Sequence, residues 1–341
     1  MKFRAQLALS LFGIACLSIA WGACSSSTAS VGASIQGDIK KSFSVQPGGK
    51  LLMDVEPGSI EVKTTGDPQI VVEVFRKVER ADPSKAEEIL RQHEVTFEQN
   101  GNELIIRAKA RNNEGFKFWR RNNLNVRYLV SIPTEFNVDL KTSGGSVSVS
   151  DLRGEVRSRT SGGSLSFGKI EGPVIGDTSG GSINIAGCKG RTDLNTSGGS
   201  IDIDSGTGEM TAKTSGGSIK IDNFNGNVFA RTSGGDIRAN SIAGAIDAST
   251  SGGSVSVSIK GQPGKDSRLH TSGGGITVEI EENVALNIDA EASGGSVSTE
   301  LPVMVQGQIR KEALRGTLNG GGYALVLQTS GGSIHLRKPR K

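Results

Sequence analysis

Apolar and polar residues alternate in short runs that return every 18 residues through the middle of the chain. Each run reads apolar, polar, apolar, as in Val147-Ser148-Val149, Ile183-Asn184-Ile185 and Ile219-Lys220-Ile221. This period of two, carried largely by β-branched residues, is typical of a strand with one buried face. A second set of apolar positions follows later in each repeat and predicts a second short strand, as at Val156 and Val174.

A glycine-rich phrase separates these runs at a fixed interval. Thr-Ser-Gly-Gly begins at Thr142, Thr160, Thr178, Thr196, Thr214, Thr232, Thr250, Thr271 and Thr329, with Ala292 leading a variant. A fixed period of this length indicates a solenoid, in which each repeat stacks on the last. The phrase predicts these structural corners: Gly144, Gly145, Gly162, Gly163, Gly180, Gly181, Gly198, Gly199, Gly216, Gly217, Gly234, Gly235, Gly252 and Gly253.

The repeat predicts an all-β fold, a parallel β-helix or β-solenoid with about 18 residues per turn. Such short strands become stable when the next turn pairs with them at about 4.8 Å. A further apolar position is held by Leu152, Ile170, Cys188, Phe224 and Ile242, and Thr207 stands there in one repeat. Glycines that follow this position at corners, from Gly154 to Gly244, are expected to supply a positive φ.

The flanking segments predict five parts of the chain. Residues 1–23 read as a signal peptide, 24–40 as a flexible tether, 41–140 as degenerate solenoid turns, 141–337 as the glycine-rich solenoid and 338–341 as a basic tail. In the degenerate part, Ile60 and Val62 repeat the inward pattern, and Asn100-Gly101 predicts a hairpin turn. Residues 82–91 predict one short helix, which Asp82 or Ser84 can cap and which turns Ile89 and Leu90 inward.

The N-terminus indicates export. Lys2 and Arg4 precede a mostly apolar stretch over residues 5–23, as in a secretory signal peptide. Trp21-Gly22-Ala23-Cys24 is similar to a bacterial lipobox and makes Cys24 the lipidation candidate, so that acyl chains would hold the protein at a membrane. Ordinary cleavage after Ala20 or Gly22 is the alternative. Either way the protein is expected in the cell envelope, and the choice between outer membrane and periplasm stays open.

The stacked threonines and serines have a structural interpretation and a functional one. Small hydroxylated residues bond to turn backbone and stack in register, which favours a structural role. The alternative is a flat threonine ladder that binds ice or a regular polysaccharide, but these threonines lead into a Gly-Gly turn and do not lie in a Thr-x-Thr strand. A calcium-binding roll would need an acidic residue in each turn, which is missing.

Composition removes several function classes. Apolar residues make up 35% and aromatic residues 4% of the chain, which suits a narrow aliphatic core. The formal charge is +4 with both signs mixed, so no nucleic-acid partner is expected. His93, His270 and His335 lie far apart without metal-ligand spacing, and no cofactor motif occurs. Cys188 sits at an apolar position and is expected to be a small buried hydrophobe.

Residues 111–127 combine basic and aromatic side chains, including Lys117, Trp119 and Arg127. This mixture is able to grip a polyanion, a glycan or lipid headgroups. An exposed loop whose aromatic residues cover part of the stack is the simpler interpretation.

The repeats also carry a family resemblance. The Ser-Gly-Gly-Ser-Ile-x-Ile phrases, with Phe43-Ser44-Val45 and Gly58-Ser59-Ile60-Glu61-Val62 before them, resemble the bacterial putative-adhesin family of secreted β-strand-repeat proteins, a family of unknown function. The resemblance covers about residues 41–337. It implies a β-helical envelope protein with an adhesive or scaffolding role, and it supplies no catalytic residues.

These observations favour a non-catalytic envelope protein that binds a glycan or another envelope component. The outward residues Asp202, Lys220 and Arg238 are candidates for the binding face. The alternatives are a polysaccharide lyase or hydrolase on a β-helix scaffold, or a spacer without a ligand. Neither the ligand nor the oligomeric state follows from the sequence.

Overall fold

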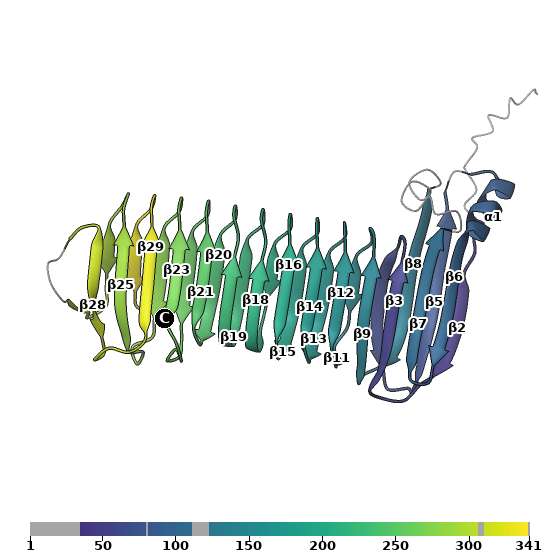
Figure 1. The fold of residues 1–341 in the computed structure, drawn as a ribbon, viewed down its shortest axis with the longest axis horizontal. Coiled ribbons are helices and arrows are strands. Elements are labelled where there is room, and N and C mark those ends of the chain that lie inside the picture. Colours follow the sequence, from purple (N-terminus) through teal and green to yellow (C-terminus); the bar gives the residue numbers. More distant parts are fainter. Residues whose placement is uncertain (1–34, 80, 111–122, 306–309, 340–341) are drawn as a thin grey trace, which may run out of the picture. The chain divides into compact units, whose positions relative to one another are not determined.

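A computed structural model describes residues 35–79, 81–110, 123–305 and 310–339. This part is almost entirely β-structure, with strands paired side by side along one axis (Figure 1). The expected all-β class with one short helix is confirmed. The helix, α1, spans Pro83–Gln92 and buries Ala86 and Ile89. Its N-cap is Asp82, although that side chain makes no capping hydrogen bond.

Strands before the regular repeats are β1 (Ile35–Gln36), β2 (Ile39–Ser44), β3 (Gly49–Val55), β4 (Ser59–Thr65), β5 (Gln69–Val78), β6 (His93–Asn100), β7 (Glu103–Ala110) and β8 (Leu124–Pro133). The repeats contribute β9 (Phe136–Thr142), β10 (Val147–Val149), β11 (Leu152–Arg153), β12 (Val156–Thr160), β13 (Leu165–Glu171), β14 (Val174–Thr178), β15 (Ile183–Lys189), β16 (Thr192–Thr196), β17 (Ile201–Ile203), β18 (Gly206–Lys213), β19 (Ile219–Arg231), β20 (Ile237–Ala243), β21 (Ile246–Thr250), β22 (Val255–Ile259), β23 (Ser267–Thr271) and β24 (Ile276–Ile280). The remaining strands are β25 (Leu286–Ala292), β26 (Val297–Thr299), β27 (Met304–Val305), β28 (Ala313–Leu318), β29 (Ala324–Thr329) and β30 (Ile334–Arg337).

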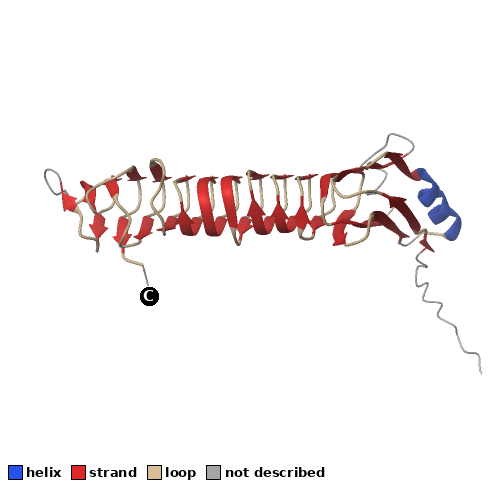
Figure 2. Ribbon diagram, turned by 90° about the horizontal axis from the view of Figure 1, so that it is seen from below, coloured by secondary structure: helices blue, strands red, loops and turns tan. Residues whose placement is uncertain are grey.

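Two columns of parallel strands run along the stack (Figure 2). The first column pairs β8, β4, β10, β13, β15, β17, β19, β20, β22, β24, β30 and β26 in that order. The second column pairs β7, β3, β9, β12, β14, β16, β18, the end of β19, β21, β23, β29 and β25. In the regular part, the partner of a strand residue lies one repeat away: Val147 pairs with Leu165, and Leu165 with Ile183.

The core lies between the columns and follows the predicted alternation. In β10, β17 and β22 the first and third residues are buried, and the residue between them faces outward. Burying each aliphatic side chain of this kind contributes about 1.5–3 kcal/mol. Repetition of the same narrow layer from turn to turn therefore explains how a chain with few aromatic residues forms one continuous core.

One apolar position is filled differently from the prediction. Thr207 is exposed, and the residue that pairs with Cys188 and Phe224 is Gly206. A Cβ at Gly206 would lie 2.6 Å from both the Cys188 Sγ and the Phe224 ring. Glycine is therefore required here because its neighbours above and below fill the space of its missing side chain. Cys188 itself is buried, as expected, and burial raises the pKa of its thiol.

The Gly-Gly corners lie in the bends after each threonine. The expected positive φ occurs at the other corner, for example at Gly190 and Gly208 with φ of 112° and 113°, but not at Gly244. In the Gly-Gly pairs φ is not positive, and the second glycine is needed for close approach. A Cβ on Gly163 would lie 2.5 Å from the Ser146 nitrogen, and closer still to the carbonyl group of Gly145 in the turn before.

The threonines that lead into these corners face inward. Thr160 Oγ1 donates a hydrogen bond of 2.8 Å to the Gly145 carbonyl and accepts one of 3.4 Å from the Gly163 nitrogen. The same pair of bonds recurs at Thr178, Thr196, Thr214, Thr232, Thr250, Thr271 and Thr329. Each hydroxyl thus joins two successive turns. The structural interpretation of the threonines is confirmed, and an exposed threonine ladder is excluded because these side chains are buried.

The order of the turns in the stack differs from their order in the chain at both ends. The turn of β3 and β4 lies between β7–β8 and β9–β10, where Ile60 and Val62 pair with Val147 and Val149 as predicted. The turn of β29 and β30 is inserted between β23–β24 and β25–β26. The last repeat in the chain is therefore an internal layer.

Antiparallel strands close the two ends. β6 pairs with β7, with the predicted hairpin turn at Gly101, whereas β5 pairs with β8. β28 pairs with β25, and β27 with β28. The end of the predicted tether, 24–40, contains strand structure, because β1 and the start of β2 pair with β5. Residues 1–34, with Cys24, and most of the basic-aromatic segment at 111–127 lie outside the described residues.

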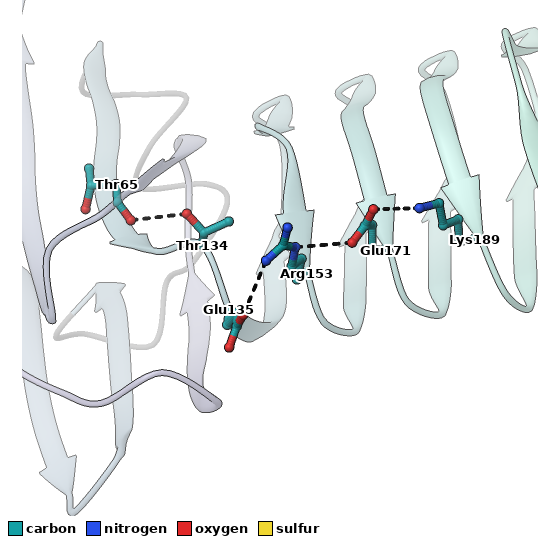
Figure 3. A network of polar contacts seen from close by, with 6 residues as sticks. All are labelled: Thr65, Thr134, Glu135, Arg153, Glu171 and Lys189. Atoms are coloured by element: carbon teal, nitrogen blue, oxygen red, sulfur yellow. Dashed lines mark hydrogen bonds and ion pairs between the residues drawn. The ribbon is translucent and has the colours of Figure 1, made fainter.

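Ion pairs join neighbouring turns on the surface (Figure 3). Arg153 lies between Glu135 and Glu171 at 3.4 and 3.2 Å, and Lys189 continues the row at 2.6 Å from Glu171. Hydrogen bonding to Lys189 holds the pKa of Glu171 below its usual value. All four side chains are well exposed, so each pair contributes little by itself, and the row mainly keeps adjacent turns in register.

Candidate binding groove

One groove lies on the outer surface of the second column. It has a volume of about 510 Å³ and is lined by residues of β18, β19, β21, β23 and the segment before β23. Side chains that face outward from four paired strands form its floor: Thr211, Phe229, Asp247 and Arg268 stand in one row. The volume falls within the range of ~300–1,000 Å³ that is common for ligand sites.

Phe229 is the aromatic member of this floor. It occupies an outward position and is only partly buried, in a chain with few aromatic residues. Lys213 Nζ and the Arg231 guanidinium lie 5.5 and 5.2 Å from the centre of its ring. Such cation–π contacts stabilise a cation by about 0.5–1 kcal/mol at an exposed site. Phe229 therefore holds two cations at the edge of the groove.

One wall of the groove comes from a longer connection. The interval between Thr250 and Thr271 is 21 residues, three more than the regular repeat, and the added length falls in residues 260–266. Gln262 fixes this loop through two hydrogen bonds of 2.9 Å with the backbone of Ala285. Asp266 accepts a bond of 2.9 Å from the Ala324 nitrogen. The loop is thus bound to the inserted turn, and it presents Lys265 beside the floor.

The charged groups of the groove are not matched with each other. Glu209, Asp247, Lys265 and Arg268 form no ion pair with any residue that the structure describes. Asp247 and Arg268 stand opposite each other in register. Elsewhere in the second column the register partners Arg159 and Asp177 do form a pair, at 3.4 Å. The groove therefore keeps donors and acceptors of both signs free for a ligand.

The face expected from the sequence lies elsewhere. Asp202, Lys220 and Arg238 stand in one outward row of the first column. Lys220 is paired with Asp222 at 2.7 Å, and Arg238 with Asp236 at 2.8 Å. Two of the three predicted residues are therefore already engaged. Sequence reasoning missed Phe229, although an aromatic residue at an outward strand position near the first enlarged interval of the repeat was a usable signal.

A buried polar cluster lies at the opposite end, under α1. The Tyr128 hydroxyl is 3.2 Å from His93 Nε2, and Arg76 donates to the carbonyls of Gly37, Leu90 and His93. Arg76 thereby places a cation at the C-terminus of α1. Burial, with a smaller contribution from Arg76, lowers the pKa of His93 to about 4. Burial raises the pKa of Tyr128 above its usual value. This cluster fastens the helix to the stack.

The described residues contain no group of three or more His, Cys, Asp or Glu side chains arranged to hold a metal ion. His335 bonds to Ser298 at 2.7 Å, and His270 faces outward from β23. Among the same residues, no helix has the length and apolar character needed to cross a membrane.

These features define a solenoid of stacked parallel turns with an open groove on one face. The chain belongs to the Toastrack DUF4097 family, whose model matches residues 49–337. The expected family resemblance is thereby confirmed.

The solved structures that match this chain have low sequence identity to it. A putative adhesin from Parabacteroides merdae is 12% identical with a TM-score of 0.38, covering 88% of this chain and 95% of its own. A putative adhesin from Bacteroides fragilis is 12% identical with a TM-score of 0.34, covering 88% and 97%. A putative cell adhesion protein from Clostridium sporogenes is 10% identical with a TM-score of 0.22, covering 89% and 100%. A comparison with curated proteins gives no match.

Proposed function

We propose that this protein is a non-catalytic, adhesin-like binding protein that holds an extended glycan against the second column. The observation that carries the proposal is the groove, where Phe229 and several charged groups without protein partners face solvent on a rigid sheet. Sugar rings offer C–H faces for an aromatic floor and hydroxyls for charged side chains. A site on paired strands needs little reordering when a ligand binds, which favours affinity.

A repeating ligand suits a repeating scaffold. We infer that each 18-residue repeat makes one full turn, because strand partners along the regular part lie one repeat apart. Adjacent strands are then about 4.8 Å apart. A polymer that lies along the axis would meet a new row of side chains at each turn, and several weak contacts then act together through effective concentration.

We further propose that the protein is exported and held at a membrane through Cys24. The basic start, the apolar stretch and Trp21-Gly22-Ala23-Cys24 support this placement. Mass spectrometry of the mature N-terminus from fractionated cells tests it. An acylated Cys24 in the membrane fraction is expected, and an unmodified start in a soluble fraction would refute the anchor.

Binding of the exported chain to a panel of neutral and acidic polysaccharides tests the main proposal. We expect at least one glycan to bind. Phe229→Ala should weaken that binding about tenfold, because burying an aromatic side chain contributes about 1.5–3 kcal/mol. The matched control is the triple alanine variant of Asp202, Lys220 and Arg238, which should bind as the wild type does. Weaker binding by the triple variant, with unchanged binding by Phe229→Ala, would place the binding site on the first column. Release of reducing ends during the assay would instead favour a polysaccharide-cleaving enzyme.

A further inference from the structure

The chemistry of the groove narrows the class of ligand, an inference that rests on the function proposed above. Four cations surround its floor: Lys213 and Arg231 over the Phe229 ring, and Lys265 and Arg268 along the wall. None of the four forms an ion pair with a described carboxylate, and Arg231 bonds only to a hydroxyl, Ser249 Oγ at 3.0 Å.

Other rows of the surface are matched instead. In the turns around β11 to β15, cations of neighbouring repeats alternate with acids, and Arg153 lies between two glutamates (Figure 3). In the groove, by contrast, the carboxylates of Glu209 and Asp247 are present and equally free. Cations held on an aromatic ring and beside a fixed loop are therefore positioned to take an anion from outside the protein.

The presence of free acids among the cations argues against a ligand that is only anionic. Glu209 and Asp247 are acceptors when ionised and would repel a row of phosphates or a polyglutamate segment. The same carboxylates bind a ligand that also offers hydroxyl donors. The floor provided by Phe229 adds a contact for an apolar face.

We propose that the groove binds an acidic polysaccharide in which sugar carboxylates occur along the chain, such as a polyuronate. Carboxylates of the ligand face Arg268, Lys265 and the two cations on Phe229. Ring hydroxyls donate to Asp247 and Glu209, and a C–H face lies on the exposed part of the Phe229 ring. Charge-assisted bonds to carboxylates are stronger than neutral ones and favour Arg in bidentate geometry.

The test compares polygalacturonate with its carboxyl-reduced form, by isothermal titration of the full exported chain at two salt concentrations. We expect the reduced polymer to bind at least tenfold more weakly, and the affinity for polygalacturonate to fall as salt rises. Arg268→Ala should weaken binding about three- to tenfold and flatten the salt dependence. The control variant Arg238→Ala removes an exposed arginine from the first column and should leave the affinity and its salt dependence unchanged.

The outcomes separate the two proposals. Equal binding of the two polymers, or binding of neutral glycans alone, would overturn the acidic ligand and leave glycan binding intact. Failure of every glycan in the neutral and acidic panel would overturn both. Loss of binding in Arg238→Ala but not in Arg268→Ala would remove the groove as the site. Matching circular dichroism spectra and melting curves ensure that each variant compares folded protein.

Discussion

The stacked Gly-Gly corners allow a prediction with an internal control. Gly163→Ala places a methyl group 2.5 Å from the Ser146 nitrogen and closer to the carbonyl of Gly145, whereas Gly162→Ala places one at 3.5 Å from the Gly144 oxygen, an ordinary contact. Neither glycine has a positive φ, so backbone strain does not distinguish them. Both substitutions also reduce the entropy of the unfolded chain equally, by about 0.4–1 kcal/mol. Their difference therefore reports the clash between turns.

The magnitude follows from the bonds that join these turns. Atoms at optimal separation lie about 3.5 Å apart, so the alanine at 163 must separate the corners by roughly 1 Å. The bond from Thr160 Oγ1 to Gly145, at 2.8 Å, and that from the Ser164 nitrogen to Ser146 Oγ, at 3.2 Å, would then be lost. Each bond contributes about 1 kcal/mol, and a buried group left unsatisfied costs about 1–3 kcal/mol. We expect Gly163→Ala to destabilise the fold by about 2–4 kcal/mol relative to Gly162→Ala.

Urea unfolding followed by circular dichroism measures this difference. The free energy of unfolding of Gly162→Ala should lie within about 0.5 kcal/mol of the wild-type value or slightly above it. Gly163→Ala should shift the midpoint to lower urea concentration. If the two variants unfold within about 0.5 kcal/mol of each other, close approach of the turns is not the reason for the second glycine.

Three further expectations concern other contacts. Thr196→Val should lower the free energy of urea unfolding by about 1–3 kcal/mol, because the hydroxyl bonds to Gly181 and Gly199 are lost. Thr196→Ser keeps a hydroxyl and should recover most of this stability. Equal losses in the two variants would show that the hydroxyl is not the source of the stability. His93 has a folded pKa of about 4, below the unfolded value of about 6.5, so its contribution is complete above pH 6.5 and declines as pH falls towards 4, by up to about 3 kcal/mol. The difference in stability between wild type and His93→Gln should therefore shrink over that range, and a constant difference would contradict the assignment. Arg153→Met should change stability by less than about 1 kcal/mol, with the effect vanishing at about 1 M salt, and a larger or salt-independent loss would mean a different role for Arg153.

The sequence predicted the regular turns well because one physical rule sets them. A residue that must face the narrow core is aliphatic, as at Ile201 and Ile219. The next residue along each strand faces outward and is polar. The close approach at each corner adds a glycine that no other residue can replace. Where these two requirements repeat without a break, the register between turns follows directly from the spacing.

Three features depended on contacts that spacing does not encode. Gly206 stands at an apolar position because the side chains of Phe224 and Cys188 occupy the space that its own side chain would take. A small residue that is compensated by large residues in the neighbouring turns cannot be recognised from one repeat alone. The insertion of β29 between β23 and β25 puts the layers in a different order from the chain, and the repeat spacing does not encode that order. The groove forms only where the stack brings four strands together and places the loop at 260–266 near Phe229. The spacing of the repeats does not reveal this arrangement.

The insertion of the β29–β30 turn bears on how the stack would respond to mechanical load. An edge strand is hydrogen-bonded to a single neighbour, so a pull on its end breaks the bonds of one ladder. β30, which ends at residue 337, is bonded on both sides, to β24 and β26, and all three strands run parallel. A pull on residue 337 would therefore load two ladders in shear at once, and forced unfolding is governed by the rate of that rupture. The groove wall is tied to β29 of the same inserted turn, through the bond from the Ala324 nitrogen to Asp266. The inserted turn that anchors the groove wall is thus also the one that resists extraction from the stack.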